Sequence, residues 1–238
     1  MLWLSRKDIE HISRRLLRDY LKKVPQKVDH IDPADFAEKM CGLQFTFADI
    51  SEAHDAIGLT ATSEVIITIP QRDGTRLDYE LDGKTAFIDQ SLVAENQIGR
   101  LNFTMMHEAA HQLFWMLYPE EDEVQTPRCV FRLADEHTQY PVLDWEEWQP
   151  NVLTSFLLLP KELVYRHMAN VGLKDGISVL NRIYARKDYE RFSEAAKRLG
   201  VSKTALTIRL SQLGLVGRND LYDPYALVDI FPEKNEIA

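Results

Sequence analysis

Apolar residues recur every three or four positions near the start of the chain, from Ile9 to Leu21. This spacing places them on one face of an α-helix. Ser5 followed by Asp8 has the pattern of a capping box, in which the two side chains accept hydrogen bonds from free backbone N–H groups. The pattern ends before Pro25, so a helix is predicted between Ser5 and Pro25.

A second, shorter helix is predicted from the residues that border it. Asp32 precedes Pro33, which suits an N-cap followed by proline at the first helical position. Gly42 is placed to end this helix, because glycine readily adopts the left-handed conformation found there. Phe36 and Met40 are expected to face the core.

Short apolar runs separated by Asp-Gly pairs follow the two helices. Asp73-Gly74 and Asp82-Gly83 are typical of tight turns between neighbouring strands. The pattern predicts a small antiparallel sheet, with strands at residues 43–47, 65–69, 77–81 and 85–88.

Helical periodicity returns after the sheet. Asn96 is the expected N-cap of a helix that runs to Leu117, where Tyr118-Pro119 ends it. Residues 119–143 show little periodicity and are predicted to form a long loop. Helices, sheet and further helices follow one another in an α+β order, with later helices at about 144–159, 161–171, 177–184, 188–199 and 203–213.

The helix predicted to end at Leu117 carries His107, Glu108 and His111 in an H-E-x-x-H pattern. Residues four apart share one helix face, so both imidazoles can reach one ion while Glu108 approaches its open coordination position. Zinc held by two imidazoles and a carboxylate keeps a fourth position for water, whose pKa falls to about 7. Glu108 would accept the proton of that water and deliver it to a leaving amine. The alternative interpretation is an amphipathic helix whose two histidines bind nothing.

A catalytic zinc site needs a third protein ligand. The candidates downstream are Glu146 and Glu147, at the start of the next predicted helix, and His137 in the preceding loop. The spacing of these residues alone does not choose among them.

Two strings of the sequence resemble the ImmA/IrrE family of metallo-endopeptidases: NFTMMHEAAH at 102–111 and DWEEWQPNVLTSFLLLP at 144–160. That family pairs an H-E-x-x-H helix with a second helix bearing E-x-x-A-N and, further on, L-L-M-P. Its metal-binding glutamate lies thirteen residues before the closing proline, which corresponds to Glu147 here. The resemblance implies a zincin-like fold, zinc as cofactor, Glu108 as general base and His107, His111 and Glu147 as ligands.

The resemblance further implies a bacterial cytoplasmic protease that cleaves a partner protein, typically a transcriptional repressor of a mobile element or stress regulon. Zincins commonly take an extended peptide alongside an edge strand, and residues 85–88 suit that role as well as that of a buried hairpin strand. Pro150 departs from the family pattern, which has alanine at this position. Because proline disfavours a helix interior, the second helix is expected to start near Glu147 or to kink there.

The segment 192–213 has the pattern of a helix-turn-helix, with Gly200 at the turn and Ser202 as N-cap of the second helix. Its proposed recognition face comprises Lys203, Thr204, Thr207 and Arg209. Proteins that read a DNA sequence usually carry several Arg, Asn or Gln side chains there, which hydrogen-bond to base edges. Protein docking or a structural role is therefore favoured over DNA binding. The second candidate function is nevertheless a non-catalytic, metal-binding regulator that contacts DNA through these helices.

Charge and composition narrow the classes of partner. The net charge of −9 argues against a surface that coats nucleic acid, and it is unevenly distributed. Residues 119–148 carry nine acids and two bases, whereas residues 185–218 carry eight bases and three acids. Two cysteines and no long apolar run indicate a cytoplasmic protein without a membrane anchor. A peptidase domain at 1–172 and a helical region at 173–238 are predicted.

Other side chains have two interpretations. Aromatic residues on the two predicted metal-site helices could line a cleft, but at helical spacing they more often fill the core: Phe114, Trp115, Trp145 and Trp148. His137 and Tyr140 lie in the predicted loop and are candidates for stabilising an oxyanion.

Overall fold

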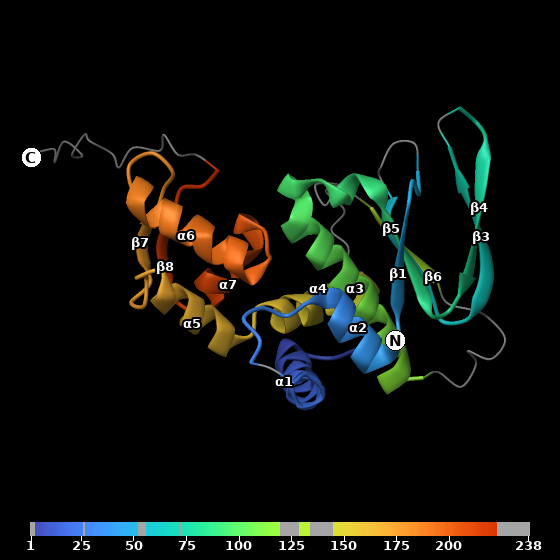
Figure 1. Cartoon of the computed structure of the whole chain (residues 1–238), viewed down its shortest axis with the longest axis horizontal. Helices are drawn as coiled ribbons and strands as arrows, with labels where there is room; N and C mark the ends of the chain where they lie inside the picture. Colours follow the sequence, from blue (N-terminus) through green and yellow to red (C-terminus); the bar gives the residue numbers. More distant parts are fainter. Residues whose placement is uncertain are drawn as a thin grey trace, which may run out of the picture.

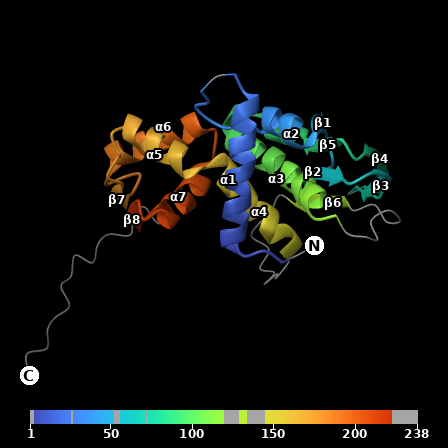
Figure 2. The same cartoon turned by 90° about the horizontal axis from the view of Figure 1, so that it is seen from below.

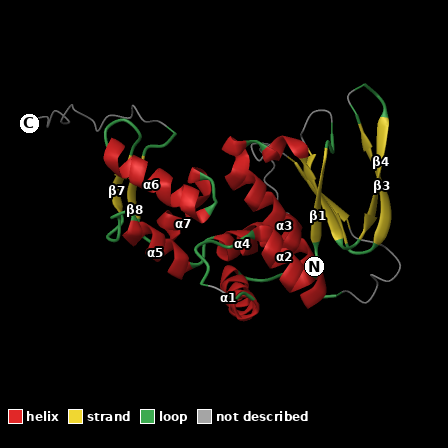
Figure 3. Cartoon of the chain, in the orientation of Figure 1, coloured by secondary structure: helices red, strands yellow, loops and turns green. Residues whose placement is uncertain are grey.

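The computed structural model describes residues 3–25, 27–51, 56–71, 73–119, 129–133 and 145–222. Within them the fold is α+β, with small mixed sheets. Figure 3 shows strands gathered at one end, helices in the middle and a small strand pair at the other end. The helices are α1 (Arg6–Lys23), α2 (Pro33–Cys41), α3 (Ile98–Leu117), α4 (Trp145–Leu158), α5 (Lys161–Asn170), α6 (Arg186–Leu199) and α7 (Lys203–Gln212). The strands are β1 (Gln44–Ala48), β2 (Ala56–Ala61), β3 (Glu64–Pro70), β4 (Arg76–Asp82), β5 (Thr85–Asp89), β6 (Cys129–Leu133), β7 (Ile177–Leu180) and β8 (Val216–Asn219).

Local capping signals set several helix ends as predicted. Ser5 and Asp8 form the capping box of α1, and the Asp32 side chain accepts the N–H groups that begin α2. Gly42 ends α2 in the left-handed conformation. The prediction for α3 was wrong at its start, because Asn96 lies in a 3-10 turn (Glu95–Gln97) and Gln97 is the N-cap.

The predicted single antiparallel sheet is wrong in its topology. Four strands form a mixed sheet in the order β1-β5-β2-β6, in which β1 and β5 are parallel and the other neighbours antiparallel. β3 and β4 form a separate two-stranded ribbon. Residues 85–88 belong to β5, which pairs on both sides and is therefore no edge strand. The sheet instead ends in β1 and in β6, and β6 lies within the stretch predicted to be a loop.

α3 packs against the four-stranded sheet and passes through the middle of the molecule (Figure 1). The Gln112 side chain ties the helix to β2, because its amide donates to the Thr60 hydroxyl at 2.9 Å and to the Ala61 carbonyl at 2.7 Å. α2 and α4 pack against other sides of the same helix. The central turns of α3 are consequently buried on all sides.

The C-terminal helices and the β7–β8 pair lie on the other side of α1, which crosses the middle of the molecule in Figure 2. Residues 177–184 were predicted to be helical, but β7 begins at Ile177 and pairs in parallel with β8. One hydrophobic cluster joins α1, α3 and α4 to α6 and α7, including Phe114, Leu157 and Phe192. No helix among the described residues is both long and apolar enough to span a bilayer.

The turn between α6 and α7 forms as predicted, with Gly200 in the left-handed conformation and Ser202 as N-cap. The proposed recognition face does not form. Thr207 and Arg209 are 4% and 5% exposed, and only Lys203 and Thr204 of the four residues are exposed. Arg209 points into the protein, where its Nε donates to the Leu159 carbonyl at 3.0 Å and its guanidinium lies 4.8 Å from the Phe156 ring centre.

Replacing Arg209 with alanine is expected to destabilise the fold by about 1–3 kcal/mol, because the buried Leu159 carbonyl loses its donor. The free energy of unfolding, measured in urea, reports this loss. Ser211→Ala on the exposed side of α7 is the matched control, with an expected change within about 0.5 kcal/mol. Equal stability of the Arg209→Ala variant and the control would contradict a stabilising role for the arginine.

Candidate metal centre

Two histidines four residues apart on α3 face one another at the centre of the site. His107 and His111 are each 1% exposed, and their ring centres are 4.7 Å apart. Their Nε2 atoms are 3.0 Å apart. The spacing in sequence thus gives the arrangement expected for two imidazoles that share an ion.

α4 brings a carboxylate to the same point. The Oε2 atom of Glu147 lies 3.1 Å from His107 Nε2, and its Oε1 atom lies 3.4 Å from His111 Nε2. One ligand atom from each of the three residues lies within 4.8 Å of the others. Of the three candidates for the third ligand, Glu147 is therefore brought to the histidines. His137 and the side chain of Glu146 lie outside the described residues.

The electrostatics of the site favour an ionised carboxylate. Burial raises the pKa of Glu147, but hydrogen bonds and charge interactions with His107 and His111 lower it by more, so it lies below its usual range. Two imidazole nitrogens from buried histidines and an oxygen of a carboxylate that is 37% exposed then converge, so the site opens to solvent on the Glu147 side. These donors suit zinc or another divalent first-row metal, so the cluster could hold such an ion.

Glu108 follows His107 directly in sequence and is fully buried. Gly58 on β2 lies directly against it, because a β-carbon placed on Gly58 would be 2.3 Å from Glu108 Oε1. The same β-carbon would be 3.0 Å from Thr104 Cγ2, one helical turn earlier on α3. Gly58 therefore leaves the space that the Glu108 carboxylate occupies. The sequence carried a signal for this role, since glycine inside an apolar strand often marks a close approach.

Gln149 is a second residue that the sequence did not single out, and it holds α4 in place. Gln149, two residues after Glu147, is fully buried, and its side-chain oxygen accepts the backbone N–H of Leu4 at 2.8 Å. This bond connects the segment before α1 to the ligand-bearing turn of α4. α4 begins at Trp145, so Pro150 lies inside the helix and the expected start near Glu147 was two residues late.

The remaining candidates are core residues or lie outside the described side chains. Phe114 and Trp115 are buried, and Trp148 packs against the main hydrophobic cluster, as the core interpretation predicted. The Trp115 ring lies 5.6 Å from the His111 ring and so covers one side of that imidazole. His137, Tyr140 and the side chain of Trp145 lie outside the described residues.

In comparisons with known proteins, no protein-family model matches the chain, and no curated protein sequence matches it.

Proposed function

We propose that this protein is a zinc-dependent endopeptidase of the ImmA/IrrE type that cleaves a regulatory protein in the cytoplasm. The convergence of His107, His111 and Glu147 carries the proposal, together with the buried acid that follows the first histidine. A structural zinc site is closed by four protein ligands and has no use for an adjacent acid. Glu108 therefore favours hydrolysis over a regulator with a structural metal.

The chain's residues divide the chemistry between them. His107, His111 and Glu147 would hold the metal, which when bound supplies Lewis acidity and lowers the pKa of water to about 7. Glu108 would accept the proton of the attacking water and pass it to the amine of the leaving peptide. Gly58 and Thr104 confine the Glu108 carboxylate on the side of the sheet.

The sheet edge gives a place for an extended substrate. β6 pairs with β2 through Arg132 opposite Gly58, and Gly58 in turn contacts Glu108. In the described sheet β6 is an end strand, so an extended peptide could be added along its free edge, one strand beyond the strand that contacts Glu108. The role of a peptide-binding edge strand, expected for residues 85–88, is thus proposed for β6.

The proposed activity is tested by incubating zinc-loaded protein with a library of peptides from a bacterial proteome. Mass spectrometry of the products should reveal new peptide termini that are lost when zinc is chelated. A full set of products that is unaffected by chelation, or the absence of any products, would contradict the proposal.

Replacing Gly58 with alanine is expected to lower kcat about 10²-fold or more while zinc stays bound. The added methyl group would displace the Glu108 carboxylate, and a misplacement of about 1 Å can cost this much. Zinc content and cleavage rate are measured on the same preparation. Gly74→Ala strains the backbone, because Gly74 has a φ of +84°, but its β-carbon meets nothing within 4 Å, so it is a control for destabilisation away from the site. An unchanged kcat in Gly58→Ala would contradict the role given to this contact.

A further inference from the structure

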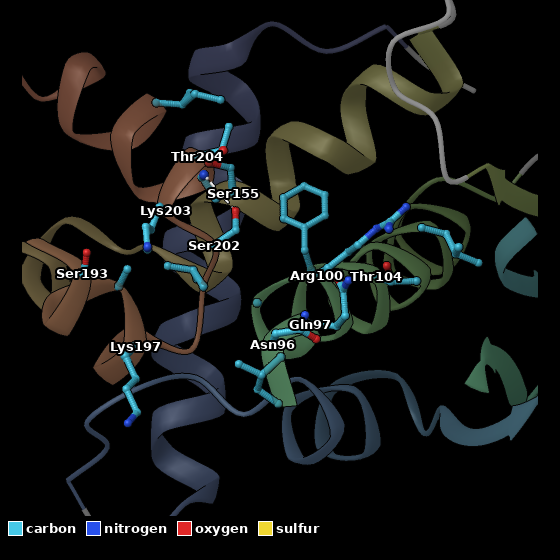
Figure 4. A pocket seen from close by; sticks show the side chains of 18 of the residues that line it. Asn96, Gln97, Arg100, Thr104, Ser155, Ser193, Lys197, Ser202, Lys203 and Thr204 are labelled. Atoms are coloured by element: carbon cyan, nitrogen blue, oxygen red, sulfur yellow. Dashed lines mark hydrogen bonds between the residues drawn. The ribbon is translucent and has the colours of Figure 1, made fainter. Parts of the chain in front are cut away.

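A groove of about 760 Å³ lies beside the proposed catalytic centre, between the first turns of α3 and the α6–α7 turn. Figure 4 shows Arg100 of α3 and its N-cap residue Gln97 on one side, and Lys197 of α6 and Lys203 of α7 on the other. Its volume is in the range of sites that enclose a ligand of several residues or a drug-sized molecule. The groove is thus large enough for a short peptide segment.

The two sides of the groove are held together by close backbone contact. The Asn102 side chain donates to the Gly200 carbonyl at 2.8 Å. A β-carbon placed on Gly99 would lie 2.3 Å from the Ser202 nitrogen, so the first turn of α3 touches the start of α7. The groove is therefore a fixed feature of the fold.

The lining combines positive charge with exposed apolar surface. Its charged residues are Arg100, Lys197 and Lys203, and no acidic residue is among the described residues that line it. The Lys203 ammonium donates to the Tyr189 hydroxyl at 2.8 Å, which leaves two of its three N–H groups for a ligand. Ile98, Ile208 and Tyr222, which also line the groove, are 49%, 52% and 82% exposed. Such a surface matches a partner that carries both carboxylates and apolar side chains.

At Thr104 the groove adjoins the turn of α3 that precedes Glu108. Thr104 lines the groove. A β-carbon placed on Gly58 would lie close to both the Thr104 side chain and the Glu108 carboxylate, so these two side chains are near the same point of β2. Thr104 and Glu108 are four residues apart, so they share one face of α3. A chain lying in the groove would therefore be about one helical turn along α3 from the base, which is itself fully buried.

We propose that this groove is a docking site for an acidic, partly apolar segment of the protein substrate, which holds the scissile region near Glu108. This inference rests on the proposed function, because only a peptidase would dock a segment of a protein substrate here. The chain has a net charge of −9, so a groove lined by positive charge alone would attract acidic segments that the rest of the surface repels.

Duplex DNA fits the same surface less well. In a helix-turn-helix the first residues of the second helix enter the major groove. Here the N-cap Ser202 lies against the first turn of α3, and the Arg209 side chain is buried. Exposed isoleucines in a hollow favour a peptide over the phosphate backbone of a duplex, which is contacted mainly by cationic and polar groups.

Binding is measured with the Glu108→Gln protein, so that no cleavage occurs and the result does not depend on peptidase activity. The probe is a short fluorescein-labelled peptide of alternating glutamate and leucine, followed by fluorescence anisotropy. The double variant Lys197→Glu/Lys203→Glu, built in this background, should bind the probe at least about tenfold more weakly. A peptide with lysine in place of glutamate should bind the parent protein weakly.

Lys174→Glu/Lys187→Glu is the matched control, because both lysines are exposed and lie outside the groove. It should bind the acidic probe like the parent protein. Equal affinity of the two double variants would overturn the proposal. A labelled duplex that binds more tightly than the acidic probe, and loses affinity on Lys197→Glu/Lys203→Glu, would assign the groove to nucleic acid instead. Selective peptide binding without any cleavage by the wild-type protein would leave the docking site standing and refute the peptidase.

Discussion

Replacing Glu108 with glutamine is expected to abolish measurable peptide cleavage while leaving the metal in place. The amide keeps the size of the side chain in its buried position but does not accept a proton. General acid–base catalysis contributes about 10²–10⁴-fold to a rate, so kcat should fall by at least this amount. The measurement is the rate of product formation by zinc-loaded protein, with zinc content determined on the same sample.

Glu162→Gln on the surface of α5 is the matched control, since it makes the same chemical change at an exposed position. It should leave both zinc content and kcat unchanged. Cleavage by Glu108→Gln at the rate of this control would eliminate Glu108 as the base. Loss of zinc from Glu108→Gln would instead place this carboxylate among the groups that hold the metal.

Replacing His111 with alanine is expected to remove the stabilisation that zinc gives to the folded protein. A ligand that binds only the folded state stabilises it by about 4 kcal/mol at a thousand times its dissociation constant. His111 supplies one of three converging donors, and even loss of a supporting partner costs about 10–100-fold in metal affinity. The Tm of the wild type should therefore rise on adding zinc, whereas that of His111→Ala should hardly change.

His167→Ala separates this effect from general damage to the core. His167 is buried and contacts the Asp29 carbonyl through Nε2 at 2.6 Å, away from the cluster of donors. Its replacement should lower the Tm of the zinc-free protein but preserve the increase caused by zinc. An equal zinc-induced increase in His111→Ala and wild type would contradict the assigned ligand.

Local signals in the sequence predicted local structure well. Ser5 and Asp8, Asp32 and Gly42 act within one turn of the backbone they cap, so their effect does not depend on the rest of the fold. β2 was missed because all its residues are buried, which leaves no alternation of apolar and polar positions to detect. β6 and β7 were missed because strands this short are stabilised by partners distant in sequence.

The part of the candidate site that lies on α3 could be predicted from the sequence, and the part contributed by other elements could not. His107 and His111 are brought together by the helical repeat, whereas Glu147 was chosen among its neighbours only through a family resemblance. Gly58 and Gln149 act through contacts across the fold, with β2 against α3 and α4 against the N-terminal segment. A glycine in an apolar strand indicates a close approach at Gly58, but its partner and the role of Gln149 are identified only once the packing of these elements is known.

X-ray absorption at the zinc edge of the metal-replete protein tests most directly whether His107, His111 and Glu147 hold a catalytic ion. The wild type should show two imidazole nitrogens and oxygen donors at about 2.0–2.2 Å, without sulfur. Glu147→Ala should lose an oxygen donor or the metal itself. A spectrum unchanged by Glu147→Ala, or a wild-type protein that takes up no zinc, would contradict the account.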